Sequence, residues 1–431
     1  MITAEIKLWG NPVGAIFWDE NELTASFEFF RKFIATGLDI APFTMPLSTA
    51  GRGRVFSFPS LNQDTFHGLP GLLADSLPDK YGTTLIDAWL ARNGRSPESL
   101  NPVERLCYIG KRGMGALEFE PAIQTTDEYS STLEIAGLVE MARDILSDRK
   151  DFATKLEPGT AKGLEDIIKV GTSAGGARAK AIIAYNNATN EVRSGQVEAP
   201  AGFNHWLIKF DGIDSGILGT SQGYGRVEYA YYKMAIACGI NMMECRLYEE
   251  GDRAHFMTKR FDRIGHKDKV HVQTLCGLLH FDYKQPGAYS YEQAFQAMRE
   301  LKLGYPAADQ MFRRMVFNVM ARNCDDHTKN IAFLMNEEGT WSLAPAYDMS
   351  HAFNPKSRWI DAHNITLNGK RDNFEIADFL SVAKQMNIKK PKEIIDQISD
   401  TISRWKFFAK DAGVNEVFIN ELAATHLLLR P

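Results

Sequence analysis

The sequence predicts an α+β protein of two lobes, a mixed α/β N-terminal lobe and a mainly helical C-terminal lobe. Its 431 residues are too many for one simple core, so two or three packed units are expected. Short β-like runs dominate the opening segment, whereas helical periodicity dominates beyond Phe261. Polar motifs lie near the junction of the two patterns, which is typical of an enzyme that works in a cleft.

The first part of the chain is expected to be β-rich. Residues 2–30 alternate β-like runs with Gly, Asn and Asp turn residues, which predicts short strands. A proline-rich loop follows at residues 41–48, and residues 79–94 predict a helix closed by Gly94. The polar stretch at residues 122–134 is the first candidate boundary. We therefore expect an N-terminal domain over residues 1–125.

The second expected domain, residues 126–260, mixes helices and strands. Helical patterns cover residues 133–146 and 226–239, and strand patterns cover residues 179–185 and 205–210. A further strand, residues 255–263, leads into the third domain, residues 261–431. In that domain one predicted helix face consists of Phe312, Met315, Val316, Val319 and Met320. Another consists of Ile394, Ile398, Ile402 and Trp405.

Composition excludes several classes of protein. The 44% hydrophobic and 24% charged residues are ordinary for a soluble globular protein, and the net charge of -5 gives no global attraction to nucleic acid or anionic membrane. The N-terminus lacks the pattern of a signal peptide, and no apolar run approaches the ~18 residues that span a bilayer. Five widely spaced cysteines without a CxxC pair predict free thiols in a reducing compartment. We expect a cytoplasmic protein with no membrane contact.

The sequence NCDDHTKN, residues 323–330, carries the strongest chemical signal. Phosphoryl transfer needs a carboxylate that positions the attacking hydroxyl and oxygen ligands for magnesium. Protein kinases supply both from one loop, with an Asn five positions after the Asp, and Asp325 and Asn330 have this spacing. Asp326 competes as the base but is one residue out of register. The alternative is a solvated acidic turn before a strand.

A second carboxylate, Asp348, lies in APAYDMSHAF, residues 344–353, after a predicted strand. An Asp at the end of a strand matches the second magnesium ligand of a kinase, although such a residue is more often a turn cap. Its position eighteen residues after Asn330 favours the metal-binding interpretation.

The phosphate end of a nucleotide site requires backbone donors and a lysine. GTSAGGARAK, residues 171–180, offers glycines whose backbone N–H groups can approach phosphate oxygens, or else forms a flexible hairpin turn. Lys209 lies in an otherwise apolar strand, and Glu228 opens a helix nineteen residues later. The two could pair as the strand lysine and helix glutamate of kinases do. Otherwise Lys209 is an edge-strand lysine and Glu228 a helix-start charge.

Two further features have more than one interpretation. HFMTKRFDR, residues 255–263, could contact an adenine edge through its backbone with Phe261 packing nearby, or its charges could form a salt-bridged strand exit. His327 could bind a metal or act as a base. Without a second His or Cys nearby, it fits better as a hydrogen-bonded brace for the loop.

Together these segments resemble the HipA family of bacterial toxin kinases, whose fold is distantly related to phosphatidylinositol kinases. The resemblance runs along nearly the whole chain, in order and at family-like spacing. It comprises KLWGNPVGAIFW, LADSLPDKYG, YIGKRGMGALEFEP, GTSAGGARAK, WLIKF, RFDR, NCDDHTKN and PAYD.

The resemblance implies a kinase-like fold and an ATP- and Mg²⁺-dependent serine/threonine protein kinase. It makes Asp325 the catalytic base, Asn330 and Asp348 the metal ligands, and Lys209 the lysine that contacts phosphate. The implied ATP-binding set is Gly175, Gly176, Ala177, Lys209, Lys259, Phe261, His327, Lys329, Asn330 and Asp348. At Lys259 the best-known member has an acidic residue, a change that backbone contacts to the nucleotide would tolerate.

The resemblance also implies regulation and partners. The family's Gly-rich loop carries a serine whose autophosphorylation switches the enzyme off, and Ser173 matches it, with Thr172 as a rival. Relatives act as toxins that phosphorylate an aminoacyl-tRNA synthetase, glutamyl-tRNA synthetase in the best-studied case. A small helix-turn-helix antitoxin of HipB type usually neutralises them and carries the complex to DNA.

Three other functions remain open from the residues. A lipid or small-molecule kinase on the same scaffold is disfavoured by the lack of a membrane-binding stripe. A catalytically weak or inactive co-regulator would act through a DNA-binding antitoxin. A glycosidase using Asp325 and Asp348 as acid and base would leave the Gly-rich loop and Lys209 without a role.

Overall fold

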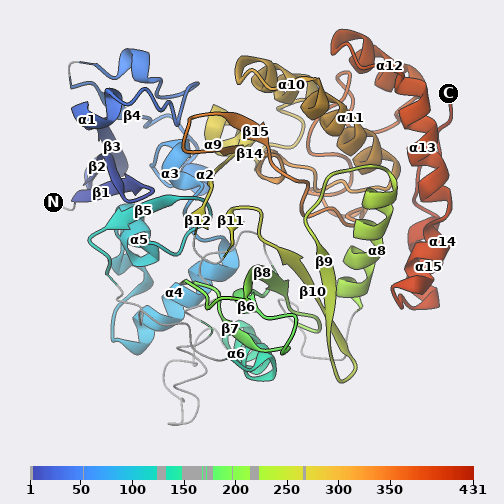
Figure 1. Ribbon diagram of the computed structural model, residues 1–431, viewed down its shortest axis with the longest axis horizontal. Helices are drawn as coiled ribbons and strands as arrows, with labels where there is room; N and C mark the ends of the chain where they lie inside the picture. Colours follow the sequence, from blue (N-terminus) through green and yellow to red (C-terminus); the bar gives the residue numbers. More distant parts are fainter. Residues whose placement is uncertain are drawn as a thin grey trace. The chain divides into compact units, whose positions relative to one another are not determined.

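The structure, a computed structural model, describes residues 3–51, 53–123, 133–147, 167, 171, 178–196, 198–213, 223–265 and 268–431. Its chain forms two compact units (Figure 1). Unit 1 comprises Met1–Gln222, Tyr248–Gln273 and Asn336–Gly339, and unit 2 comprises Gly223–Leu247, Thr274–Met335 and Thr340–Pro431. The division into three domains at residues 125 and 260 stays a prediction.

Unit 1 begins with a five-stranded antiparallel sheet in the order β4-β3-β2-β1-β5. Its strands are β1 (Thr3–Leu8), β2 (Asn11–Asp19), β3 (Thr24–Phe29), β4 (Val55–Ser57) and β5 (Leu117–Glu120). The first three confirm the strands expected in residues 2–30. Buried and more exposed residues alternate along them, as expected for a sheet with one face on the core.

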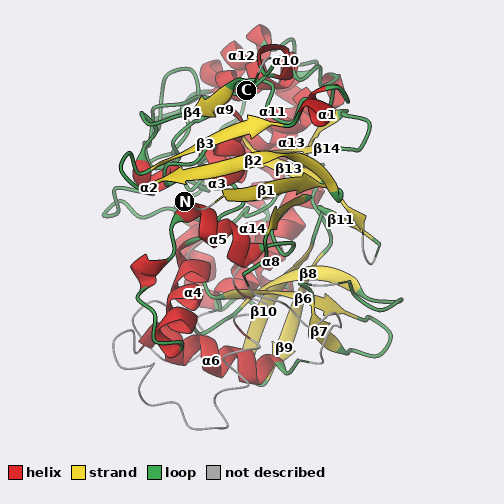
Figure 2. Ribbon diagram, turned by 90° about the vertical axis from the view of Figure 1, so that its left-hand side faces the viewer, coloured by secondary structure: helices red, strands yellow, loops and turns green. Residues whose placement is uncertain are grey.

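A second sheet of unit 1 has the order β7-β6-β8-β10-β9. Its strands are β6 (Lys180–Tyr185), β7 (Val192–Ser194), β8 (Asn204–Lys209), β9 (Cys245–Glu250) and β10 (Arg253–Lys259). Figure 2 shows α4 (Lys80–Arg92) and α6 (Ile135–Ser147) on the same side of this sheet, and apolar residues of both helices and of β6, β8 and β10 form one core.

Helix α4 forms as the sequence predicts. The side chain of Asp79 accepts a hydrogen bond from the Gly82 N–H at 2.7 Å and caps the helix. Leu85, Ile86 and Leu90 bury one face. The second carboxylate oxygen of Asp79 pairs with the Lys180 Nζ of β6 at 2.7 Å, and the Lys180 side chain is only 1% exposed. One side chain therefore both begins α4 and holds it to β6.

Among the described residues of unit 1, the remaining elements with defined bounds are short. They are α1 (Arg31–Ile34), η1 (Leu47–Thr49), α2 (Gln63–Phe66), α3 (Gly71–Ala74), η2 (Pro97–Ser99), α5 (Pro102–Ile109), β11 (Arg263–Ile264) and β12 (Asp268–Lys269). Strand β13 (His271–Thr274) lies where the chain passes into unit 2.

Unit 2 is mainly helical, as predicted. Its elements are α8 (Tyr224–Ala237), α9 (Leu275–Leu279), α10 (Tyr291–Glu300), α11 (Tyr305–Met320), η4 (Thr328–Asn330), the hairpin β14 (Ala332–Met335) and β15 (Trp341–Leu343), α12 (Ile376–Gln385), α13 (Pro391–Ser403), α14 (Trp405–Asp411) and α15 (Glu416–Ala423). Helix α11 packs against α10 and α13, and α8 packs against α13 and α14 (Figure 1).

The predicted apolar faces of unit 2 are confirmed, with one difference in the C-terminal stretch. All five predicted α11 residues are fully buried, and Ile394, Ile398, Ile402 and Trp405 are buried as well. The C-terminal stretch is two helices, however, because α13 ends at Ser403, and the Arg404 N–H bonds the Thr401 carbonyl in a tighter turn. Residues 344–375, all described, form no helix or strand beyond isolated bridges.

All five cysteines lie among the described residues, where each is buried and forms no disulfide. Among the described residues, no helix has the length and apolar character needed to cross a membrane.

Candidate active site

Asp325 lies on a loop, residues 323–330, that follows α11 directly and is called the Asp325 loop below. Helix α11 ends at Met320, and Arg322 adopts a left-handed conformation (φ +57°) that turns the chain out of the helix. The Asp325 side chain is 48% exposed, and its Oδ1 lies 3.8 Å from the Nε2 of His327. A half-exposed carboxylate of this kind is accessible to a substrate hydroxyl.

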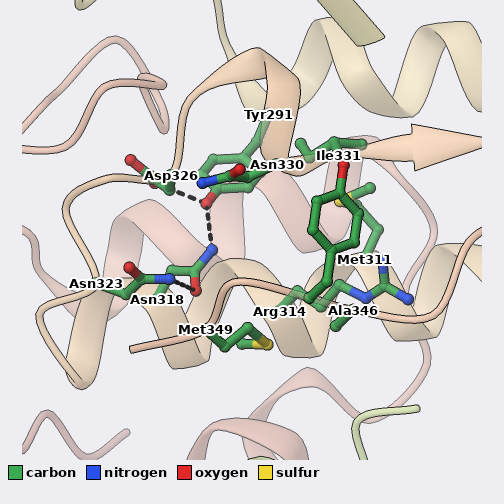
Figure 3. A pocket seen from close by; sticks show the side chains of 11 residues that line it. Tyr291, Met311, Arg314, Asn318, Asn323, Asp326, Asn330, Ile331, Ala346 and Met349 are labelled. Atoms are coloured by element: carbon green, nitrogen blue, oxygen red, sulfur yellow. Dashed lines mark hydrogen bonds between the residues drawn. The ribbon is translucent and has the colours of Figure 1, made fainter. Parts of the chain in front are cut away.

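Asp326, the neighbouring carboxylate, has the opposite environment. Its side chain is 1% exposed, and Oδ2 accepts hydrogen bonds from the Tyr291 hydroxyl at 2.7 Å and from the His363 Nδ1 at 2.9 Å. Oδ1 accepts the Asn364 N–H at 2.8 Å. Figure 3 shows the Tyr291 hydroxyl between Asp326 and Asn318, whose amide donates to it at 3.0 Å. Asp326 is therefore an internal anchor.

His363 completes a buried ion pair with Asp326. Burial by itself lowers the pKa of His363, but the Asp326 charge and hydrogen bond outweigh it and raise that pKa to about 10. The imidazole is therefore protonated at neutral pH, and both members of the pair are removed from water.

The structure brings the two predicted metal ligands onto adjoining loops. Asp348 lies in residues 344–350, called the Asp348 loop below. The hydroxyl of Tyr347 donates to the carbonyl of Lys329 at 2.5 Å, so the residues next to Asp348 and Asn330 are bonded directly. Asp348 has a φ of +54°, a left-handed conformation that is strained for a residue with a side chain. Strain of this kind is common at functional sites.

The donor set fits Mg²⁺. Asn330 donates its Nδ2 to the Asp325 carbonyl at 2.7 Å. The Oδ1 of the same side-chain amide therefore points away from that carbonyl. An amide oxygen and one carboxylate, completed by water and phosphate oxygens, are ligands that Mg²⁺ commonly takes. Among the described residues, no cluster of three or more His, Cys, Asp or Glu could hold a metal, so His327 belongs to no such cluster.

A small pocket in unit 2 adjoins these loops (Figure 3). Asn330 and Tyr347 line it together with Asp326, Tyr291 and Asn318. Residues of the Asp325 loop and of helix α11 thus line the same pocket.

His327 and Lys329 both approach the ring of Tyr283. The His327 ring centroid lies 5.2 Å from that of Tyr283, and the Lys329 Nζ lies 4.8 Å from it. Among the described residues the buried Nδ1 of His327 has no hydrogen-bond partner, so the hydrogen-bonded brace stays a prediction. The nucleotide contacts of both residues stay predictions.

The other predicted nucleotide-binding residues belong mainly to unit 1. Lys209 ends β8, half-buried, with its Nζ 5.8 Å from the centroid of the Phe256 ring, and Lys259 ends β10 opposite Trp206. Glu228 is buried on α8 in unit 2, so its pairing with Lys209 stays a prediction. Thr172, Ser173, Gly175, Gly176 and Ala177 lie outside the described residues.

The RFDR charges form a buried ion cluster, which confirms the salt-bridged interpretation. The fully buried Asp262 carboxylate accepts bonds from Arg260 and Arg263 at 2.6 Å each and from the Gly115 N–H at 2.8 Å. The desolvation of Asp262 is outweighed by the two guanidinium groups, which hold its pKa well below the usual range. Phe261 lies half-buried between these charges, and its contact with adenine stays a prediction.

Two family models match the chain. The HipA N-terminal domain matches residues 4–120, and the HipA-like C-terminal domain matches residues 172–405, more than half of the chain. The chain belongs to the HipA family. The C-terminal match contains Lys209, Asp325, Asn330 and Asp348, and the resemblance inferred from the motifs is confirmed.

Known proteins of this kind are similar in fold more than in sequence. A chain in the solved Shewanella oneidensis MR-1 toxin–antitoxin complex of HipA, HipB and operator DNA matches with a TM-score of 0.69 and 16% identity, covering 98% of this chain and 95% of that one. The Sinorhizobium fredii protein named "Putative kinase Y4mE" is 21% identical over 212 residues, which are 44% of this chain and 49% of the relative. This HipA-family chain thus aligns with about half the length of that curated relative. The two-lobed, kinase-like α+β fold is confirmed.

Sequence reasoning missed three residues of the site in this HipA-family chain. Tyr291, His363 and Asn364 all bond Asp326, but they lie 35 to 38 positions away from it in sequence. The only signal was indirect: a carboxylate one residue out of register with Asn330 needs another role.

Proposed function

We propose that this HipA-family chain is an ATP- and Mg²⁺-dependent serine/threonine protein kinase. The observation that carries the proposal is the difference in environment between the two aspartates of the Asp325 loop. Asp326 is bonded on both oxygens inside unit 2, whereas Asp325 is half-exposed beside a loop pair that presents Asn330 and Asp348. That arrangement supports a base and a metal-ligand set of the kind that phosphotransferases use.

In the proposed reaction Asp325 accepts the proton of a serine or threonine hydroxyl. The hydroxyl oxygen forms a bond to the γ-phosphorus of ATP, the bond from that phosphorus to the bridging oxygen breaks, and ADP leaves. Asn330 and Asp348 would hold Mg²⁺, which neutralises charge on the phosphate oxygens. The half-exposed position of Asp325 supports the role, because a base must reach its proton within hydrogen-bond distance.

The nucleotide would be held mainly by unit 1. Lys209, supported by Glu228, would contact phosphate, Lys259 and Phe261 would adjoin adenine, and Gly175, Gly176 and Ala177 would cradle phosphates. His327 and Lys329 would complete the set from the Asp325 loop. Autophosphorylation of Ser173, or of Thr172, would switch the enzyme off, because a dianionic phosphate repels those of ATP.

The wider role follows from the family. We propose that the protein is a cytoplasmic toxin of a toxin–antitoxin system. Its substrate would be an aminoacyl-tRNA synthetase, with glutamyl-tRNA synthetase as the first candidate. A HipB-type antitoxin would neutralise the toxin and make most contacts with DNA. The Shewanella oneidensis complex of HipA, HipB and operator DNA supports these partners for this chain.

Intact-mass and peptide mass spectrometry after incubation with ATP and Mg²⁺ would test the kinase. We expect phosphate on Ser173 of the wild type. For Asp325→Asn we expect the rate of phosphate transfer to fall by at least about 10²-fold, the loss expected when a general base is removed. Asp400→Asn, which alters an exposed carboxylate of α13, is the matched control and should behave as wild type. Nucleotide binding without transfer to any protein would overturn the kinase proposal and favour a co-regulator.

A further inference from the structure

An irregular stretch of unit 2, residues 359–372, forms hydrogen bonds with the Asp325 loop and is called the bracing segment. The side chain of Asn364 donates Nδ2 to the carbonyl of Cys324 at 2.7 Å and to the carbonyl of Trp359 at 2.9 Å. Its backbone N–H and the neighbouring His363 bond the two oxygens of Asp326. The bracing segment thus bonds the residues immediately before and after Asp325.

Burial makes these bonds difficult to replace with water. His363 is fully buried and Asn364 is 6% exposed, and Asp326 is 3% exposed. A buried carbonyl or carboxylate that loses its donor stays without a partner, so the loop would have to move to regain one.

The bracing segment is itself fixed. Arg371 donates its Nε to the His363 carbonyl at 2.7 Å, and Arg322 pairs with Asp372 at 2.9 Å. The guanidinium of Arg322 also lies 3.9 Å from the centroid of the Phe353 ring. The bracing segment therefore bonds Arg322, which directly follows the end of α11, as well as the two residues that flank Asp325.

We propose that His363 and Asn364 are positioning residues for Asp325, an inference that rests on the kinase proposed above. The Cys324 carbonyl is bonded to Asn364, and the Asp325 carbonyl is bonded to Asn330. The peptide groups on both sides of Asp325 are thereby oriented, and its carboxylate is aimed by the backbone. A displacement of about 1 Å in a catalytic group can cost ~10²-fold in rate.

Three kinds of variant test this role. Asn364→Ala removes the donor to Cys324 but keeps the backbone bond to Asp326, and Asn364→Asp keeps the shape while replacing the donor with an acceptor. His363→Asn retains an N–H near the position of Nδ1, whereas His363→Ala removes it. Lys370→Met is the matched control, because it breaks an ion pair of the same segment with Asp378, away from the Asp325 loop.

The measurements are the rate constant of phosphate transfer at saturating ATP, the ATP concentration that gives half of it, and the melting temperature. For Asn364→Ala and Asn364→Asp we expect the rate constant to fall ~10²-fold with half-saturation within about two-fold of wild type. His363→Asn should keep more activity than His363→Ala. Lys370→Met should lower only the melting temperature.

Hydrogen exchange of the peptide covering residues 323–330 provides a readout independent of turnover. It should accelerate at least tenfold in Asn364→Ala and stay unchanged in Lys370→Met. A wild-type rate constant or wild-type exchange in Asn364→Ala would overturn the inference while leaving the kinase intact. A wild type that binds ATP and transfers nothing would instead overturn the kinase, and with it the role of these residues in transfer.

Discussion

At the scale of single residues, two adjacent aspartates have different environments and different proposed roles. Asp325 is half-exposed, whereas Asp326 is enclosed by Tyr291, His363 and Asn364. An isolated buried carboxylate would be costly, and three donors, one of them a cationic imidazole, compensate for its loss of water. The same residue type thus serves as a candidate base at one position and as an anchor at the next.

The ion pair of His363 and Asp326 predicts a dependence of stability on pH. The folded protein raises the pKa of His363 from about 6.5 to about 10, so its contribution to stability is complete below pH 6.5 and disappears as the pH rises towards 10. Urea unfolding of wild type and His363→Asn should therefore give a difference in unfolding free energy that shrinks over this range. A difference that stays constant from pH 6.5 to 10 would contradict a protonated His363.

The sequence predicts the residues that share a motif and misses those that only the fold brings together. Asp325, Asn330 and Asp348 could be named because their spacing is typical of kinases, and the structure places Asn330 and Asp348 on bonded loops. From the sequence, Asp325 could be preferred to Asp326 as the base only because Asp325 lies five positions before Asn330. The partners of Asp326 could not be predicted, since contacts across 35 or more residues leave no local pattern.

At the scale of elements, strand β2 depends on Gly14, where β2 lies between β1 and β3. A Cβ at this position would overlap the Glu28 backbone oxygen and lie 2.8 Å from the Phe27 ring. Gly14→Ala should therefore lower the free energy of unfolding by about 1–3 kcal/mol, the usual cost of overpacking.

Chemical unfolding followed by tryptophan fluorescence would measure this loss. Gly51→Ala is the matched control, because a Cβ at Gly51 meets no atom within 4 Å. Equal stability of the two variants would show that β2 and its neighbours move apart without cost.

Local patterns predict the regular elements well and the irregular ones poorly. The strands of residues 2–30, helix α4 and the buried faces of α11 and α13 follow from alternation, capping and helical spacing. Residues 344–375 have no such period, because side chains such as Asn364 and Arg371 bond backbone groups in place of a helix or sheet. Their structure could not be predicted from the sequence.

On the scale of the whole molecule, the pair of Asp79 and Lys180 links distant parts of unit 1. Asp79→Asn keeps a side chain that can cap α4 but removes the charge beside the buried Lys180. We expect a loss of about 3–5 kcal/mol in unfolding free energy, typical of a buried charge left without its partner.

Asp87→Asn, on the same helix, is the control for this change. Its ion pair with Arg105 is partly exposed, so its removal should cost at most about 1 kcal/mol. Denaturant unfolding of both variants would compare them, and similar small losses would show that Lys180 finds another partner.

This pair has a consequence for how members of the family can exchange their parts. Asp79 lies in the segment matched by the N-terminal model and Lys180 in the segment matched by the C-terminal one, yet both belong to one compact unit. In a chimera, an imported N-terminal segment would keep this buried lysine paired only if it also carried a carboxylate at the position of Asp79. The two segments are recognisable separately in sequence, yet they share a buried ion pair that an exchange between relatives has to preserve.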